Sequence, residues 1–337
     1  MKNNATTTCV VLVCLGVGLF ALCGAKEHPR FTAEHAGTAE MKIINRIFSA
    51  TSATSAVEKL ATNADAIDVT ALKVTANLSV QGSAEKVLYA ELTPQEFRER
   101  IAAAPIAYLP LGTLEWHGEH LPLGSDGLQS YGFFIHLARE VGGIVLPMLF
   151  LGPDRMQKVD GRELYGMDIC QDMPQEMRYE NQQLAGSAYW VPEETFRTMI
   201  EAILKQLRRA GFRIVVAHGH GPSTGFFSKH AAEWKEKFGL ETFVCWGGEL
   251  DRQGMGIQVD HAAANETSLV MALRPELVQM HRLPEVSKGW PVGVAGKDPR
   301  IHAGAELGRK IIDLQTERMA KILRQALAKL SKEAPPD

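Results

Sequence analysis

Residues 105–126 read PIAYLPLGTLEWHGEHLPLGSD. The stretch begins with a nearly unbroken apolar run over residues 105–111, which is typical of a strand buried on both faces of a parallel sheet. Polar residues follow at once, and they include Glu115, His117 and Asp126. Open parallel sheets bind their ligands beyond the carboxyl ends of the strands. The stretch therefore predicts a parallel sheet with a functional site at its edge.

Strand-like and helix-like segments alternate along the remainder of the chain. This alternation indicates an α/β domain of packed layers with a mostly parallel central sheet. The predicted strands cover residues 105–111, 143–149, 213–217 and 242–246, and the predicted helices cover a segment that begins after Thr93, 191–210, 269–273 and 307–330.

The first 25 residues have the pattern of a secretory signal peptide. Lys2 gives a basic start, residues 10–22 are apolar, and small residues at 23–25 suit a cleavage site near Ala25. The apolar run is short for a membrane span. We therefore expect a secreted or periplasmic protein with no membrane contact after cleavage. The alternatives are an uncleaved anchor and lipoprotein processing at Cys23.

The pattern divides the chain into four parts. Residues 1–25 are the leader, and residues 26–86 form an accessory or linker region that we expect to be partly disordered. That region has a helix-like segment at 41–60 and weak strand signals at 67–80. Residues 87–332 carry the main domain, and residues 333–337 form a flexible tail.

Charge and cysteine content argue against two classes of function, nucleic-acid binding and zinc binding by thiolates. The chain of 337 residues has 36 Lys and Arg against 39 Asp and Glu, and it shows no basic stripe, so nucleic acid is not an expected partner. Beyond the leader only Cys170 and Cys245 remain. They could form one disulfide or stay as free thiols, and without a C-x-x-C pair they give no support to a thiolate zinc site.

Two further clusters of acidic and imidazole residues follow apolar segments. One contains His218 and His220 between glycines, and the other contains Asp260, His261 and Glu266. Carboxylate oxygen and imidazole nitrogen are ligands of Zn²⁺, Mn²⁺ and related ions. Taken singly, the clusters could be a polar surface loop, a structural turn, a core histidine or a helix N-terminal charge. Their co-occurrence predicts a metal-dependent hydrolase.

With these residues considered together, the chain resembles the creatininase (creatinine amidohydrolase) family over about residues 88–330. The resemblance implies a three-layer α/β/α sandwich with a mostly parallel sheet. It also implies two divalent ions per chain, zinc and/or manganese with iron as an alternative, and a homo-oligomer, often a hexamer. The motifs that carry it are LGTLEWHG at 111–118, HLPL at 120–123, Asp126, His220-Gly221, His261 with ETS at 266–268, and the segment 296–308.

The resemblance implies a role for each candidate ligand. Glu115 and His220 would hold one ion, His117 and Glu266 would hold the other, and Asp126 would bridge them.

The implied reaction is hydrolysis of a C–N amide bond in a small cyclic amide or formamide-like substrate by a hydroxide that bridges the two ions. His261 matches a catalytic histidine of the family and would give a proton to the leaving nitrogen, and Asp260 could orient its ring. Trp116, Trp190 and Trp246 are candidate pocket walls.

Several departures from the family pattern leave the substrate open. Pro222 stands where creatinine-hydrolysing members have a glutamate ligand, and Ala263 replaces a usual glycine. Together with Ser223, they favour an alternative, an exported metal-binding or small-molecule-binding pseudoenzyme without turnover. A metal-dependent phosphoesterase is a third interpretation, for which Arg155 and Arg252 would be the phosphate-binding residues. The glycosylation sequon at 265–267 lies in the predicted site and favours a bacterial periplasm.

Overall fold

The structure is a computed structural model in which residues 86–170 and 173–333 are described. Contacts divide the chain into two units, Met1–Leu72 and Lys73–Asp337, and every described residue belongs to the second. The predicted leader, nearly all of the accessory region 26–86 and the last four residues of the tail lie outside the described residues.

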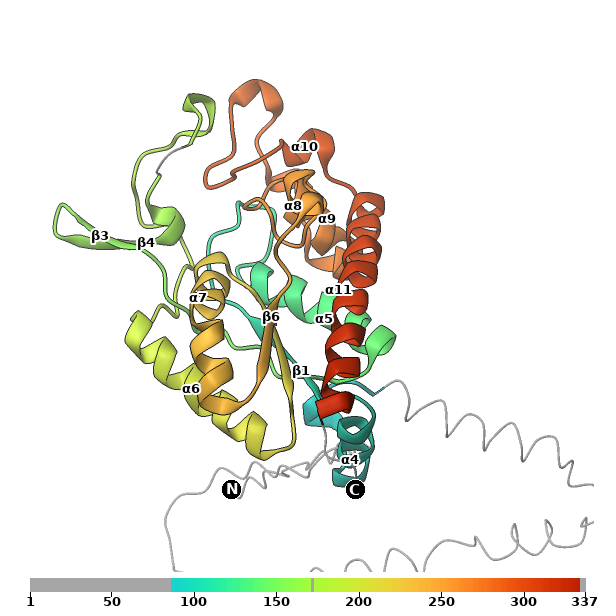
Figure 1. Cartoon of the computed structure of the whole chain (residues 1–337). Coiled ribbons are helices and arrows are strands. Elements are labelled where there is room, and N and C mark those ends of the chain that lie inside the picture. The colour runs from blue at the N-terminus through green and yellow to red at the C-terminus, as the bar shows by residue number, and fades with distance from the viewer. Residues whose placement is uncertain (1–85, 171–172, 334–337) are drawn as a thin grey trace, which may run out of the picture. The chain divides into compact units, whose positions relative to one another are not determined.

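The core of this unit is a sheet of four parallel strands in the order β2-β1-β5-β6 (Figure 1). In β1 and β5, Ile106 pairs with Ile214 and Leu111 with Gly219, so both strands end at the same edge of the sheet. The strands are β1 (Ile106–Leu111), β2 (Ile144–Val145), β5 (Ile214–Gly219) and β6 (Glu241–Val244). Only two residues of the predicted strand 143–149 belong to β2, although Leu149 forms an isolated bridge to Leu111.

Successive side chains of β1 and β5 point to opposite faces of the sheet, and they pack into a separate apolar layer on each face. Ile106 and Tyr108 of β1 pack into one buried cluster, whereas Ala107 and Leu109 pack into another on the opposite face. Helices α5 (Ser125–Val141), α9 (Ala264–Leu273) and α11 (Ala305–Glu333) cover the first face, and α6 (Glu193–Arg209) and α7 (Gly221–Phe238) cover the second.

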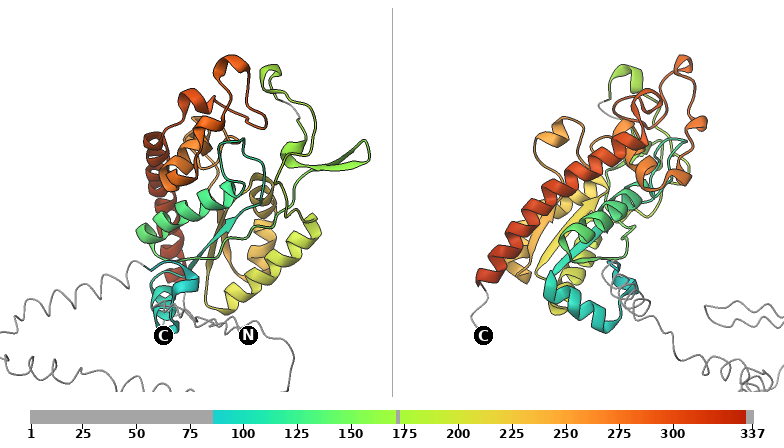
Figure 2. Two further views of the ribbon diagram at one scale, coloured as in Figure 1. Left: turned by 180° about the vertical axis from the view of Figure 1, so that it is seen from behind. Right: turned by 90° about the vertical axis from the view of Figure 1, so that its right-hand side faces the viewer.

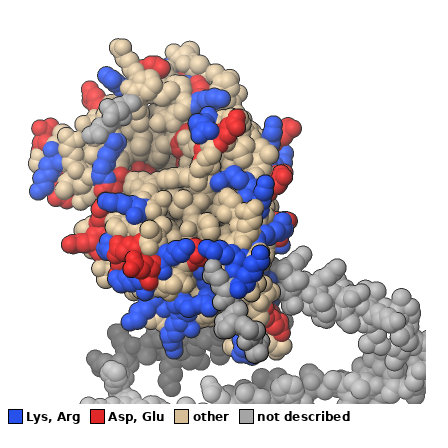
Figure 3. Space-filling model, viewed as in Figure 1, with Lys and Arg blue, Asp and Glu red and all other residues tan. Residues whose placement is uncertain are grey.

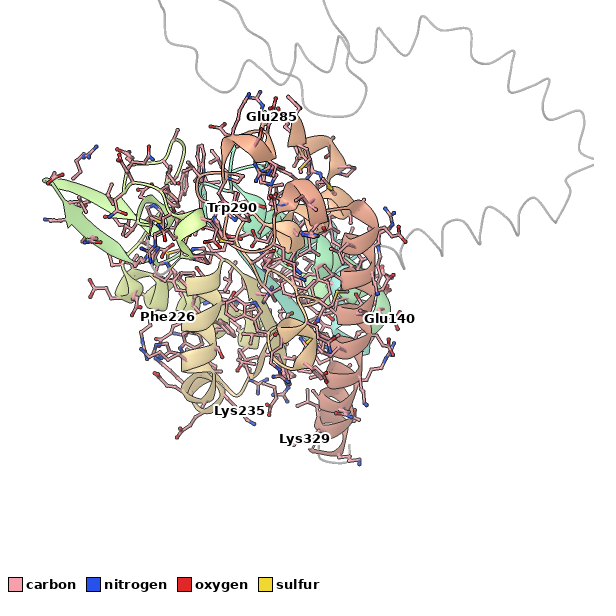
Figure 4. All side chains as sticks on the ribbon, turned by 90° about the horizontal axis from the view of Figure 1, so that it is seen from above. Glu140, Phe226, Lys235, Glu285, Trp290 and Lys329 are labelled. Carbon is pink, nitrogen blue, oxygen red and sulfur yellow. The ribbon has the colours of Figure 1, made fainter. Side chains whose placement is uncertain are left out.

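Figure 2 shows these layers from two further directions, and Figure 4, seen from above, places Phe226 of α7 and Glu140 of α5 on opposite sides of the strands. The three-layer α/β/α sandwich with a parallel sheet is therefore confirmed.

Two predicted helices form for the expected local reasons. Helix α4 (Pro94–Ala103) begins with a capping box, in which the Thr93 hydroxyl accepts from the Glu96 N–H and the Glu96 carboxylate accepts from the Thr93 N–H. Helix α6 buries one apolar stripe at i, i+4, i+8 and i+11 against the sheet. That stripe consists of Phe196, Ile200, Leu204 and Leu207.

Helices α5 and α7 are not predicted by the apolar pattern. Asp126 lies in the first turn of α5 rather than in a loop, and His220 is the N-cap of α7 rather than part of a free turn. Glycines at 124, 127, 221 and 225 and a proline at 222 interrupt the helical periodicity at both starts. A proline is tolerated in the first turn because its missing N–H has no partner there.

Smaller elements complete the domain. An antiparallel hairpin of β3 (Met156–Val159) and β4 (Arg162–Tyr165) projects from the side of the unit (Figure 1). None of the helices in residues 86–170 and 173–333 is long and apolar enough to cross a bilayer. Cys170 and Cys245 are both free. The short helices are α8 (Glu249–Arg252), α10 (Pro299–His302) and the 3-10 turns Tyr89–Glu91, Gly166–Asp168, Gln175–Met177, Pro275–Leu277, Met280–Arg282 and Val286–Lys288.

Candidate metal centre

A cavity of about 610 Å³ opens at the carboxyl edge of the sheet, where β1 and β5 end side by side. The Cα of Gly219 is pressed against β1 so closely that a Cβ there would lie 1.5 Å from the Leu111 carbonyl oxygen. The next residue, His220, donates its backbone N–H to that same oxygen at 2.9 Å. This close approach holds His220 beside the segment that carries Glu115.

The first group of candidate ligands consists of Glu115, Asp126 and His220. One ligand atom from each lies within 4.8 Å of the others, and all three residues are buried. His220 Nε2 is 3.6 Å from Glu115 Oε2. The other ring nitrogen, Nδ1, is 3.1 Å from the Ser223 hydroxyl, which fixes the ring and turns Nε2 toward the carboxylates.

The second group consists of His117, Asp126 and Glu266. His117 Nε2 is 3.2 Å from Asp126 Oδ1 and 3.5 Å from Glu266 Oε2. His117 Nδ1 is 3.1 Å from the Glu115 carbonyl oxygen and can donate to it, so this imidazole too presents Nε2 to the acids. Asp126 belongs to both groups, as expected for a carboxylate that bridges two ions.

Backbone and side-chain bonds hold these carboxylates in place. Asp126 accepts from the Gln258 amide at 3.1 Å, and Glu266, in the first turn of α9, accepts from the Ala262 N–H at 2.7 Å. Glu115 donates its N–H to the Leu123 carbonyl at 2.9 Å, which closes the loop between β1 and α5. These hydrogen bonds restrict the positions of the three candidate ligands.

Burial sets the electrostatics of the cluster. Desolvation raises the pKa of Glu115 to about 7 and raises the pKa of Glu266 well above its usual range. Burial acts the same way on Asp126, but the nearby His117 outweighs it and holds that pKa below the usual range. Conversely, desolvation lowers the His117 pKa, yet Asp126 and Glu266 bring it to about 10.

Such a cluster of buried acids is costly without cations. Its oxygen and imidazole ligands suit zinc, manganese or iron, so the residues present fit divalent ions.

His261 and Asp260 also line the cavity. His261 Nε2 is 2.8 Å from the Trp116 carbonyl oxygen, and its ring centroid is 4.3 Å from that of His117. Burial lowers the His261 pKa to about 3, so the ring is neutral near pH 7. His261 also forms a third candidate group with Glu115 and His117.

The orienting partner of His261 differs from the expected one. Among the hydrogen bonds of the described residues, none joins Asp260 to His261. Asp260 instead accepts from the backbone N–H groups of Asn265 at 2.8 Å and Glu266 at 3.1 Å at the start of α9, and burial raises its pKa to about 6. The Trp116 carbonyl orients the imidazole, and Asp260 holds the helix that carries Glu266.

Asp154 is a residue of the site that the sequence reasoning missed. Its Oδ2 lies 3.1 Å from His220 Nε2, and only 7% of its side chain is exposed. The overlooked signal was its place five residues after the apolar segment 143–149, which runs to the same edge of the sheet.

Other candidate residues lie outside the ligand groups. His218 is buried with Nε2 3.2 Å from the Ile257 carbonyl, and its ring packs against Trp246. Trp190 packs against the His220 ring at 5.7 Å without lining the cavity. Asn265 of the sequon is buried and donates its side-chain amide to the Gly254 and Gly256 carbonyls, which leaves no access for a glycan in the folded protein.

Fold and site together define an α/β/α protein with candidate divalent-metal ligands at the carboxyl edge of its sheet. The chain belongs to the creatininase family, because the family model for creatinine amidohydrolase matches residues 90–163 and 173–323. It is thus a creatininase-family amidohydrolase, a class that acts on amide C–N bonds.

Individual relatives agree with this assignment. The chain is 29% identical over 217 residues to creatinine amidohydrolase of Pseudomonas putida, which covers 59% of this chain and 76% of the relative. A mutant creatininase complexed with creatine shares the fold with a TM-score of 0.55 and 22% identity, over 72% of this chain and 98% of that chain. A manganese form and a mutant of Zn–Zn type share it with a TM-score of 0.54 at the same identity and coverage.

Proposed function

We propose that this protein hydrolyses a C–N amide bond of a small substrate with two divalent ions bound at the edge of its sheet. Glu115 and His220 would hold one ion, His117 and Glu266 the other, and Asp126 both. The observation that carries the proposal is the overlap of the two ligand groups in Asp126. The manganese and Zn–Zn forms of creatininase support ions of this kind.

When bound, a pair of such ions supplies Lewis acidity and lowers the pKa of a bound water to roughly 7. Besides holding the ions, the chain would supply a side chain, His261, that accepts and donates a proton. His261 Nε2 is engaged by the Trp116 carbonyl, so Nδ1 is the atom available to the substrate. A neutral ring can accept a proton at Nδ1 during attack and pass it to the leaving nitrogen.

The charges of the cavity favour a neutral or cationic substrate. Its lining contains several acids, and Arg155 is the one Lys or Arg among the lining residues. On the face shown in Figure 3, Lys and Arg gather instead at the lower end of the molecule. This distribution disfavours the phosphoesterase interpretation, since Arg and Lys are the side chains that usually bind phosphate oxygens. The acids that line the cavity are Glu115, Asp126, Asp154, Glu193, Asp260 and Glu266.

The substrate class that we propose is a small cyclic amide or formamide-like compound. Creatinine is one member to test, because the curated relative is a creatinine amidohydrolase. Pro222 cannot supply the carboxylate that creatinine-hydrolysing members have at its place, which favours other small amides.

The decisive experiment combines metal analysis with an amide panel. Purified protein is expected to contain about two divalent ions per chain and to hydrolyse at least one amide of the panel. Asp126→Ala should lose both ions and all activity. Full metal retention in that variant would overturn the two-ion site. Two ions in the wild type without turnover of any amide would favour the binding-protein alternative.

We also propose that the protein is exported and assembles as a homo-oligomer. Export is supported by the apolar run at 10–22 and the small residues that follow it, and assembly by family analogy. N-terminal sequencing of protein from its native host should start near residue 26, and light scattering should give a mass several times that of one chain. A mature protein that retains residues 1–20, or a monomer, would overturn the respective proposal.

A further inference from the structure

We propose that Asp154 is an additional carboxylate of the ion on the His220 side. The inference rests on the proposed function, since it needs an ion at Glu115, Asp126 and His220. It concerns a residue outside the five candidate ligands.

The backbone around Asp154 is fixed against the site. Leu149 donates its N–H to the Pro110 carbonyl at 3.0 Å and accepts from the Gly112 N–H at 2.8 Å, so this segment runs along the end of β1. Gly152 then passes close to the first turn of α7, which follows the end of β5. A Cβ at Gly152 would lie 2.2 Å from the Ser223 hydroxyl of that turn. Asp154 is two residues further on, within a segment held at both β1 and α7.

The Asp154 carboxylate is turned toward the ligands. Its Oδ1 accepts from the Arg155 N–H at 2.6 Å, while Oδ2 faces His220 Nε2 at 3.1 Å. Nε2 is the nitrogen left for an ion, because Nδ1 is taken by Ser223. Asp154 therefore approaches His220 at the atom that would bind the metal.

Glu115 approaches the same nitrogen. Its Oε2 is 3.6 Å from His220 Nε2. Ligand atoms about 2.0–2.2 Å from a common ion lie roughly 2.8–3.6 Å from one another when the angles between neighbouring ligands are those of an octahedron or tetrahedron. The two measured separations fit this spacing. Asp154 is in none of the groups whose ligand atoms all lie within 4.8 Å of one another, so its measured approach is to His220 alone, and its carboxylate would have to move closer to Glu115 and Asp126 to share the ion.

Gly166 lies behind both carboxylates. A Cβ at Gly166 would lie 2.6 Å from Asp154 Oδ2 and 2.7 Å from Glu115 Oε1. The backbone of the turn after β4 thus makes room for two acids that converge on one imidazole. A divalent ion here would supply a counter-charge to the two buried acids.

The test is metal binding by the metal-free full-length chain. Wild type, Asp154→Asn and Asp154→Ser are titrated with Co²⁺ while the visible absorption is recorded, and with Mn²⁺ by calorimetry. Glu193→Gln is the matched control, since Glu193 is an exposed carboxylate that lines the same cavity. We expect about 10- to 100-fold weaker binding of one of the two ions in both Asp154 variants, as is usual when a supporting ligand is lost.

The Co²⁺ spectrum should also change in both Asp154 variants, recover in part in Asp154→Glu, and stay unchanged in Glu193→Gln. A folded Asp154→Asn or Asp154→Ser protein with wild-type affinities and spectrum would overturn the inference while leaving the two-ion site intact. A wild-type protein that binds no divalent ion would instead overturn the proposed function itself.

Discussion

Gly219 and Leu111 are in direct backbone contact where β5 and β1 end, with room for no Cβ at position 219. This contact brings His220 next to Glu115, which lies four residues beyond the end of β1. Gly219 has φ of +147°, a backbone conformation that favours glycine. The residue thus connects the packing of the sheet to the geometry of the candidate metal centre.

We expect Gly219→Ala to destabilise the protein by more than about 2 kcal/mol, because a steric clash with backbone adds to the cost of an unfavourable φ. Denaturant unfolding measures the loss. Gly225→Ala in α7 is the control, since its Cβ would meet nothing within 4 Å and alanine favours helix. Equal stability of the two variants would contradict the close contact.

His261 should be needed for turnover and not for metal. We expect His261→Asn to lower kcat by about 10²- to 10⁴-fold, the usual range for loss of a general acid or base, with about two ions retained. Mass spectrometry of bound metal and steady-state kinetics separate the two effects. His230→Gln on α7, away from the cavity lining, is the control. Loss of one ion with His261 would instead identify it as a ligand, a role that its grouping with Glu115 and His117 permits.

The pKa of Glu115 predicts a pH effect on the metal-free protein. Its folded pKa of about 7 exceeds the ordinary glutamate pKa of 4.5, so the folded state holds a proton that the unfolded state releases between these pH values. The Glu115 contribution to stability is therefore fully present below about pH 4.5 and is lost as pH rises through 7.

Glu115→Gln does not titrate, so its stability relative to wild type should rise between pH 5 and pH 8, by an amount on the order of 2 kcal/mol. Urea unfolding of both proteins with a chelator present at each pH measures the difference. A constant difference across this range would show that Glu115 titrates normally. Added divalent ions should reduce the effect, because they stabilise the charged carboxylate.

Local patterns in the sequence predict the helices and strands whose apolar residues recur at a clear period. They fail for elements whose position is set by close backbone contacts. Phe196, Ile200 and Leu207 mark α6 because one helical face is apolar and the other charged. Helices α5 and α7 escape such reasoning because their first turns contain glycine and serine, and that of α7 also contains a proline. These residues let the backbone approach the site and hide the helical period.

The acidic and imidazole residues of the site also divide into those that sequence motifs predict and one whose position depends on packing. Glu115, His117, Asp126, His220 and Glu266 follow from motifs and from the family resemblance, and the structure brings them together. Asp154 is 66 residues from His220 in the sequence, and its position depends on how the segment after β2 packs along the end of β1. The one trace of that packing in the sequence is the apolar segment 143–149, which comes shortly before Asp154.

Gly166 offers a test of the acid cluster that leaves every charged group in place. Its φ is +52°, and a Cβ would press on the carboxylates of Asp154 and Glu115. Gly161 in the hairpin has φ of +77° and nothing within 4 Å of a Cβ. Alanine at either position should cost about 1 kcal/mol of stability from the left-handed backbone. Gly166→Ala alone should also weaken binding of one divalent ion by tenfold or more, measured by Mn²⁺ titration. Equal metal affinity in the two variants would mean that the carboxylates beside Gly166 are free to move away, and that their convergence on His220 does not depend on this glycine.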